Sequence, residues 1–119
     1  MAKITGIEIT EQEARDILTT AVESGTYGIA YWAAEHEGFD YWRDPKTHDI
    51  VRIKIVADNQ KDEKKTYIVD TDLIKWAVIE IAKSGTWNNL IGDIVEQDVD
   101  SDGADIIVQF ACFGEVIYG

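Results

Sequence analysis

The chain has little of the chemistry on which secreted proteins and most metalloproteins depend. Its 119 residues include one proline and one cysteine, Cys112, so no disulfide can form within the chain. A single thiol suits a reducing compartment. No apolar run approaches the roughly 18 residues of a transmembrane helix, and the first residues, 1–6, lack the apolar stretch of a signal peptide. We therefore expect a cytoplasmic protein that does not enter a membrane.

Catalytic and metal-binding motifs are also missing. The two histidines, His36 and His48, cannot form a zinc site with one distant cysteine. The three serines, Ser24, Ser84 and Ser101, each lie beside glycine or aspartate, which is typical of caps and turns rather than of nucleophiles. Neither of the common glycine-rich phosphate-binding patterns occurs. We predict that the chain is not an enzyme and needs no cofactor.

One segment, 98–103, resembles the first half of a calcium loop, with carboxylates at its first, third and fifth positions and glycine at its sixth. The second half fails, because Asp105 stands at a normally apolar position and Gln109 replaces the bidentate carboxylate. The alternative is a helix N-terminus capped by Ser101 or Asp102, with Asp105 in the first turn. The sequence favours the helix, and we predict no metal site.

Charge is the strongest compositional signal. Twenty-three acidic and 11 basic residues give a net charge of −12. Such a domain repels nucleic acid and anionic lipid but attracts basic surfaces, including the channels in which proteins hold DNA or RNA. The alternative is that the acidity only keeps a small protein soluble.

Length and hydrophobic pattern predict one domain of the α+β class, 1–119, with a small antiparallel sheet of about three strands packed against three to four helices. A capping box of Thr10 and Glu13 begins the first helix. The expected helices are 11–24, one that starts at 70–72 and ends at Gly85, 87–97 and 106–113; the expected strands are 27–33, 50–57 and 66–69. The stretch 27–33 could instead continue as a helix, and 115–118 could be an edge strand or a docked tail.

Half of the aromatic residues, six of twelve, fall between Thr26 and Trp42. They could form core, a protein interface, or a pocket that stacks a nucleobase beside a cation. Trp42 and its neighbour Arg43 are the first pair to test for either binding use. The cations available to such a pocket are Arg43, Lys46, Arg52 and Lys54.

The two ends of the chain carry a family resemblance. The segment 23–33, with Glu23, Gly25 and the run Tyr31-Trp32-Ala33, and the C-terminal stretch 102–119 are similar to small acidic bacteriophage proteins. The middle of the chain shows little of this similarity. The family is described as of unknown function, so the resemblance implies a phage origin and action in the cytoplasm of an infected host cell, and it assigns no site residue.

Together these features predict an inhibitor that binds a host defence protein, of the CRISPR-effector or restriction type, through an acidic surface that partly mimics nucleic acid. We expect no direct binding of nucleic acid. One alternative is a sponge for a nucleotide second messenger; another is an accessory phage protein that oligomerises, with 114–119 pairing edge to edge. The predicted partner-binding residues are Tyr31, Trp32, Glu35, Glu37, Asp40, Trp42, Arg43, Glu96, Asp98, Asp100 and Asp102.

Overall fold

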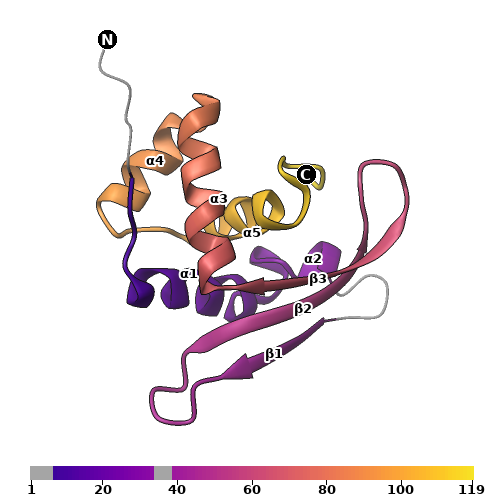
Figure 1. Cartoon of the computed structure of the whole chain (residues 1–119), viewed down its shortest axis with the longest axis horizontal. Coiled ribbons are helices and arrows are strands. Elements are labelled where there is room, and N and C mark those ends of the chain that lie inside the picture. Colours follow the sequence, from indigo (N-terminus) through magenta and orange to yellow (C-terminus); the bar gives the residue numbers. More distant parts are fainter. Residues whose placement is uncertain (1–6, 34–38) are drawn as a thin grey trace.

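The computed structural model describes residues 7–33 and 39–119, and within them a three-stranded antiparallel sheet lies beside a group of helices (Figure 1). The α+β class with a small antiparallel sheet is confirmed, although the described residues form five α-helices rather than three or four. In chain order the elements are α1 (Glu11–Glu23), the 3-10 helix η1 (Gly25–Tyr27), α2 (Ala30–Ala33), β1 (Phe39–Arg43), β2 (Ile50–Asp58), β3 (Lys64–Asp70), α3 (Thr71–Ser84), α4 (Asn88–Val95) and α5 (Ser101–Phe113).

The sheet has the order β1-β2-β3, and alternation along its central strand decides which side meets the helices. Ile53 and Ile55 are fully buried, whereas Arg52 and Lys54 are exposed, as the alternating pattern predicts. Strict alternation would bury Val51, but Ile50 is the buried residue at the start of the strand and Val51 is only half-buried. The register of β1 with β2 shifts at this point, and such a bulge reverses the facing of the residues beyond it.

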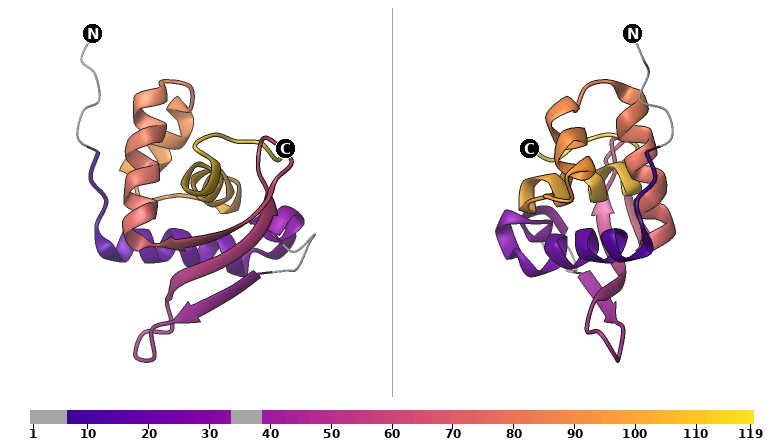
Figure 2. Two further views of the ribbon diagram at one scale, coloured as in Figure 1. Left: turned by 45° about the vertical axis from the view of Figure 1, so that its right-hand side comes forward. Right: turned by 90° about the vertical axis from the view of Figure 1, so that its left-hand side faces the viewer.

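The strand predicted at 27–33 is wrong, and the chain there folds back on α1 as η1 and α2. The amide of Ile29 donates to the carbonyl of Ala21 at 3.0 Å, which holds the turn against α1. A Cβ at Gly28 would overlap that same carbonyl, so only glycine allows this approach. The third strand is β1, and its hairpin with β2 projects away from the helices (Figure 2).

The predicted ends of two helices, α4 and α5, need adjustment. Helix α3 is as expected, with Asp70 capping its start and Gly85 in the left-handed conformation at its end. Helix α4 spans Asn88–Val95, shorter than the predicted 87–97, and its last residue, Val95, is 64% exposed. Helix α5 begins at Ser101 and not at 106, because the Asp100 side chain caps it by accepting from the Gly103 amide at 2.8 Å.

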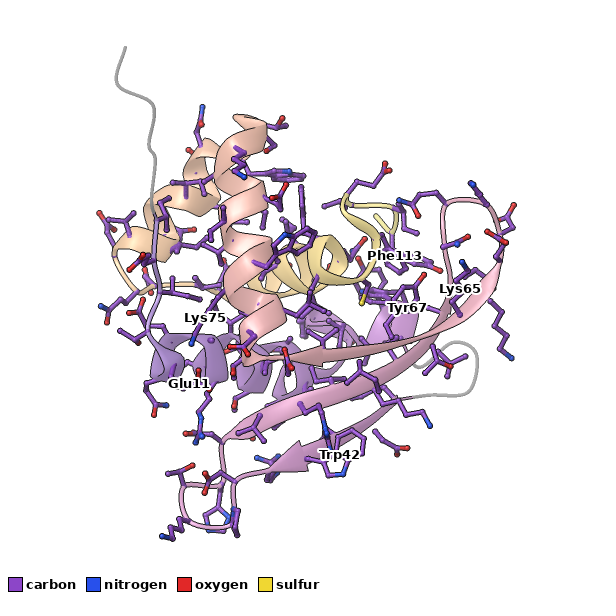
Figure 3. All side chains as sticks on the ribbon, viewed as in Figure 1. Glu11, Trp42, Lys65, Tyr67, Lys75 and Phe113 are labelled. Carbon is purple, nitrogen blue, oxygen red and sulfur yellow. The ribbon has the colours of Figure 1, made fainter. Side chains whose placement is uncertain are left out.

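The core lies between the sheet and the helices. Its buried side chains come from α1, α2, α3, α4, α5 and the helix-facing side of β2 and β3. Glu11 links two of these helices, since it accepts hydrogen bonds from Thr71 and from Lys75 on α3 at 2.6 and 2.7 Å (Figure 3). None of the helices in the described part of the chain has the length and apolarity that crossing a membrane requires.

Candidate functional site

The charge of the molecule divides between the sheet and the helices. Residues 39–70, which form the sheet and its connections, contain seven acidic and seven basic residues. The rest of the chain contains 16 acidic and four basic residues, and residues 84–119 contain no lysine or arginine at all. The net charge of −12 therefore lies entirely outside residues 39–70.

The most concentrated acidic surface is the segment from α4 to the start of α5. Glu96, Asp98, Asp100 and Asp102 are exposed there, and Asp93 is half-buried. Among the described residues no lysine or arginine forms an ion pair with any of these five carboxylates. A row of uncompensated carboxylates at a surface attracts a basic partner and not a nucleic acid. We call this segment, together with Glu13 and Asp16 of α1, the acidic face.

A small hollow lies within the acidic face, where α1 meets the α4–α5 connection. Its volume is about 110 Å³, and its walls are made by the side chains of Ile9, Ile17, Thr20, Ile94 and Val99, with Glu13, Asp16 and Gln97 also lining it. Drug-sized ligands occupy pockets of roughly 300 Å³ or more. This hollow therefore suits one side chain of a protein partner better than a nucleotide. Its mixture of aliphatic walls and carboxylates matches the stem and charged head of lysine or arginine.

The calcium-like segment at 98–103 forms the helix N-terminus that the sequence favours. The cap is Asp100 rather than Ser101 or Asp102, and the glycine of the motif has a packing role, because a Cβ at Gly103 would lie 2.8 Å from Leu90 Cδ1. No group of three or more histidine, cysteine or carboxylate side chains able to hold a metal occurs among the described residues.

Tyr31 and Trp32 belong to a buried polar cluster rather than to an exposed surface. Trp32 is fully buried, and its Nε1 donates to Asp105 Oδ1 at 2.6 Å, while the Tyr31 hydroxyl donates to Asp105 Oδ2 at 2.8 Å. Burial raises the pKa of the Asp105 carboxyl, and the three hydrogen bonds that it accepts from Trp32, Tyr31 and Gln109 oppose that shift. Burial, followed by the hydrogen bond to Asp105, also raises the pKa of the Tyr31 hydroxyl.

The same cluster fixes the C-terminal tail. Gln109 Oε1 accepts from the amides of Ile117 and Tyr118, each at 2.9 Å, and its Nε2 donates to the Tyr118 carbonyl at 3.0 Å. The Trp32 ring stacks on the Tyr118 ring with centroids 5.2 Å apart. Residues 115–118 are thus a docked tail and not an edge strand, and Tyr31 and Trp32 help to hold it. The sequence offered a signal for this cluster, because Asp105 and Gln109 are polar residues four apart on an otherwise apolar helix.

The remaining predicted residues lie on β1 and do not join the acidic face. Trp42 is 40% exposed on the solvent side of the sheet, where the Arg52 guanidinium lies 4.3 Å from its ring centroid (Figure 3). Arg43 instead approaches the ring of Tyr41. Asp40 is opposite Lys54. Figure 1 places β1 and α4 at opposite ends of the molecule.

The predicted single surface of aromatic and acidic residues is therefore divided. Glu96, Asp98, Asp100 and Asp102 lie together in the acidic face, whereas Asp40, Trp42 and Arg43 lie on the sheet, and Tyr31 and Trp32 lie in the polar cluster. Glu35 and Glu37 fall outside the described residues. The pocket expected for a nucleotide is not formed by this set, because Trp32 is buried among helices and Trp42 faces solvent.

Comparison with known proteins adds no relative: no family model, no curated protein and no solved structure matches the chain.

Proposed function

We propose that the chain is a non-enzymatic inhibitor whose acidic face covers a basic, nucleic-acid-binding surface of a host defence protein. The observation that carries this proposal is the run of 36 residues, 84–119, without a positive charge. Residues Ile94, Gln97 and Val99 of this run line the hollow, whose two carboxylates, Glu13 and Asp16, come from α1. A surface of this kind offers a basic protein the charges that it normally finds on a phosphate backbone.

Binding would combine a long-range and a short-range contribution. The charge of −12 steers the chain toward a basic channel and speeds association at low salt. At close range one lysine or arginine of the partner enters the hollow, with its stem against Ile17 and Ile94 and its head beside Glu13 or Asp16. The second contribution gives the contact a fixed position that charge alone does not.

The choice of partner rests on the sequence resemblance to small acidic phage proteins, which remains a prediction. A phage gains from blocking CRISPR effectors and restriction enzymes, and both hold DNA or RNA on basic surfaces. An inhibitor of this type excludes nucleic acid from the enzyme and needs no catalysis. Excess nucleic acid should therefore relieve the inhibition.

The test is DNA cleavage by a panel of purified CRISPR and restriction nucleases in the presence of the chain. We expect inhibition of at least one nuclease, with the apparent inhibition constant rising as DNA is added. The variant Asp16→Asn/Glu96→Gln/Asp98→Asn should lose inhibition. The matched control Asp62→Asn/Glu63→Gln/Glu80→Gln removes the same charge from the hairpin tip and α3, and it should inhibit like the unmodified chain.

Two results would overturn the proposal. One is the absence of inhibition across the panel, together with phage plaque formation in defended cells that express the chain being as restricted as in defended cells that do not. The other is an equal loss of inhibition in the two triple variants, because the net charge and not the acidic face would then decide binding.

A further inference from the structure

Strand β1 is an edge strand of the sheet. Strand β1 pairs with β2 on one side, and no strand in the described ranges pairs with it on the other. Four of its five residues are exposed, including Tyr41 at 45% and Trp42 at 40%. An edge strand with free amides and carbonyls is a template for another strand, and natural proteins usually protect such edges with proline or lysine. Strand β1 contains neither, and its only charged residues are Asp40 and Arg43, one of each sign.

Strand β3, at the opposite edge of the sheet, packs against helices. Strand β3 contacts α3 and α5, and its Tyr67 packs edge-on against Phe113 with ring centroids 5.1 Å apart (Figure 3). Strand β3 exposes Ile68 at 48%, but the exposed aromatic side chains of the sheet, Tyr41 and Trp42, are both on β1. They indicate a surface that another chain covers.

We propose that β1 pairs antiparallel with β1 of a second copy of this chain, which joins the two sheets into one of six strands. The distribution of charge favours a second copy of this chain as the partner. Two molecules of −12 repel each other over most of their surface, but residues 39–70 are neutral, with seven acidic and seven basic side chains. The sheet is thus the part of the molecule where two copies meet with least repulsion.

The strand is self-complementary when the pairing is centred on Tyr41. Phe39 then faces Arg43 of the second copy, Tyr41 faces its own equivalent, and Asp40 faces Trp42 of the second copy. Arg52 of that copy lies 4.3 Å from the Trp42 ring centroid, on the same face of the sheet as Asp40. Aromatic, cation–π and opposite-charge pairs are the cross-strand combinations that stabilise a sheet. A two-fold axis makes each contact occur twice.

This pairing is independent of the proposed inhibitory function. The α4–α5 part of the acidic face lies away from β1, so a dimer would present two copies of it (Figure 1). Asp16 lies nearer the β1–β2 turn, since the Gln12 amide donates to both Asp16 and Asp49. Salt separates the two ideas in an experiment. Screening weakens the attraction between the acidic face and a basic partner, but it relieves the repulsion between two copies of the chain.

The test is the molar mass of the whole chain by sedimentation equilibrium between about 1 μM and 1 mM, the range of weak to moderate protein complexes. We expect a monomer–dimer equilibrium that shifts toward dimer as salt is raised. The variants Tyr41→Lys and Tyr41→Glu place like charges at the two-fold axis, and each should weaken the dimer roughly tenfold or more. Mixing the two variants should restore a dimer that contains one of each.

The control is Trp76→Lys on α3, since Trp76 is 44% exposed and so matches Tyr41. It should dimerise like the unmodified chain, and circular dichroism should show that all variants are folded. A monomer at every concentration, or dimers of Tyr41→Lys as strong as those of the unmodified chain, would overturn the proposal. Failure of the mixed variants to pair would overturn the register centred on Tyr41.

Discussion

Removal of the Asp105 carboxylate tests how the helices and the tail are held together. Asp105 accepts from Trp32 on α2, from Tyr31 beside it and from Gln109 one turn along α5. In Asp105→Ala these donors lose their shared acceptor. In Asp105→Asn the side chain keeps its shape, so Oδ1 can still accept from Trp32 while the new amide donates to the Tyr31 oxygen.

The magnitude follows from which donors find another partner. Without Asp105, the Tyr31 hydroxyl and Gln109 Nε2 can still donate to the Tyr118 carbonyl, which lies 3.2 and 3.0 Å from them. The Trp32 N–H has no second acceptor among the described residues, and an orphaned buried donor costs about 1–3 kcal/mol. A lost bond to a charged group costs about 1.5–3 kcal/mol, and relief of the carboxylate's desolvation offsets part of this. We expect Asp105→Ala to lower the free energy of unfolding by about 2–4 kcal/mol, and Asp105→Asn by less than about 1 kcal/mol.

The assay is urea unfolding followed by tryptophan fluorescence, repeated from pH 3 to pH 7. Because burial raises the pKa of Asp105 above its usual 3.8, the native state keeps this proton where the unfolded chain has lost it. The contribution of Asp105 to stability therefore falls as pH rises above 3.8, and Asp105→Asn should lack that fall. A loss below about 0.5 kcal/mol in Asp105→Ala, or equal losses in both variants, would refute the reasoning.

Three further predictions concern glycine positions at Gly28 and Gly92, the residue that follows the end of α4, and the link between α1 and α3. Gly28→Ala should destabilise by more than about 2 kcal/mol because its Cβ meets a backbone carbonyl, whereas Gly92→Ala, which has open space in α4, should stabilise by about 0.5–1 kcal/mol in thermal unfolding. Gln97 has a φ of 58° where glycine is favoured, so Gln97→Gly should stabilise by up to about 1 kcal/mol. Hydrogen bonds from Lys75 and then Thr71 lower the pKa of Glu11, so its contribution is present above pH 4.5 and lost as pH falls through the lowered pKa. In acid titrations of unfolding, Glu11→Gln should cost about 0.5–1 kcal/mol at pH 7 and nothing near pH 2.

Local patterns predicted most of the elements. The capping box at Thr10, the alternation of β2 and the Asp70 cap all depend on neighbours in sequence, and each is observed. The prediction of a strand at 27–33 is wrong, because the alternation of apolar residues there does not correspond to a strand: the segment forms η1 and α2. The approach of Gly28 to the Ala21 carbonyl decides the path of the chain there, and that contact follows from tertiary packing.

The candidate surface was predicted only in part for the same reason. The acidic residues 96–102 form one exposed group, since they are adjacent in sequence. Asp40 and Trp42 were joined to them by composition, yet the sheet carries them to the other end of the molecule (Figure 1). The spacing of Asp105 and Gln109 signals a buried polar pair, but the partners Tyr31 and Trp32 could not be predicted, because they lie more than 70 residues away.

The most direct test of the acidic face is the affinity of the chain for the nuclease that it inhibits best, measured by calorimetry at increasing salt. The account predicts that affinity falls steadily with salt, and that Asp16→Asn/Glu96→Gln/Asp98→Asn binds more weakly and with a shallower dependence on salt. Affinity that does not change with salt, or a triple variant that binds as tightly as the unmodified chain, would contradict it.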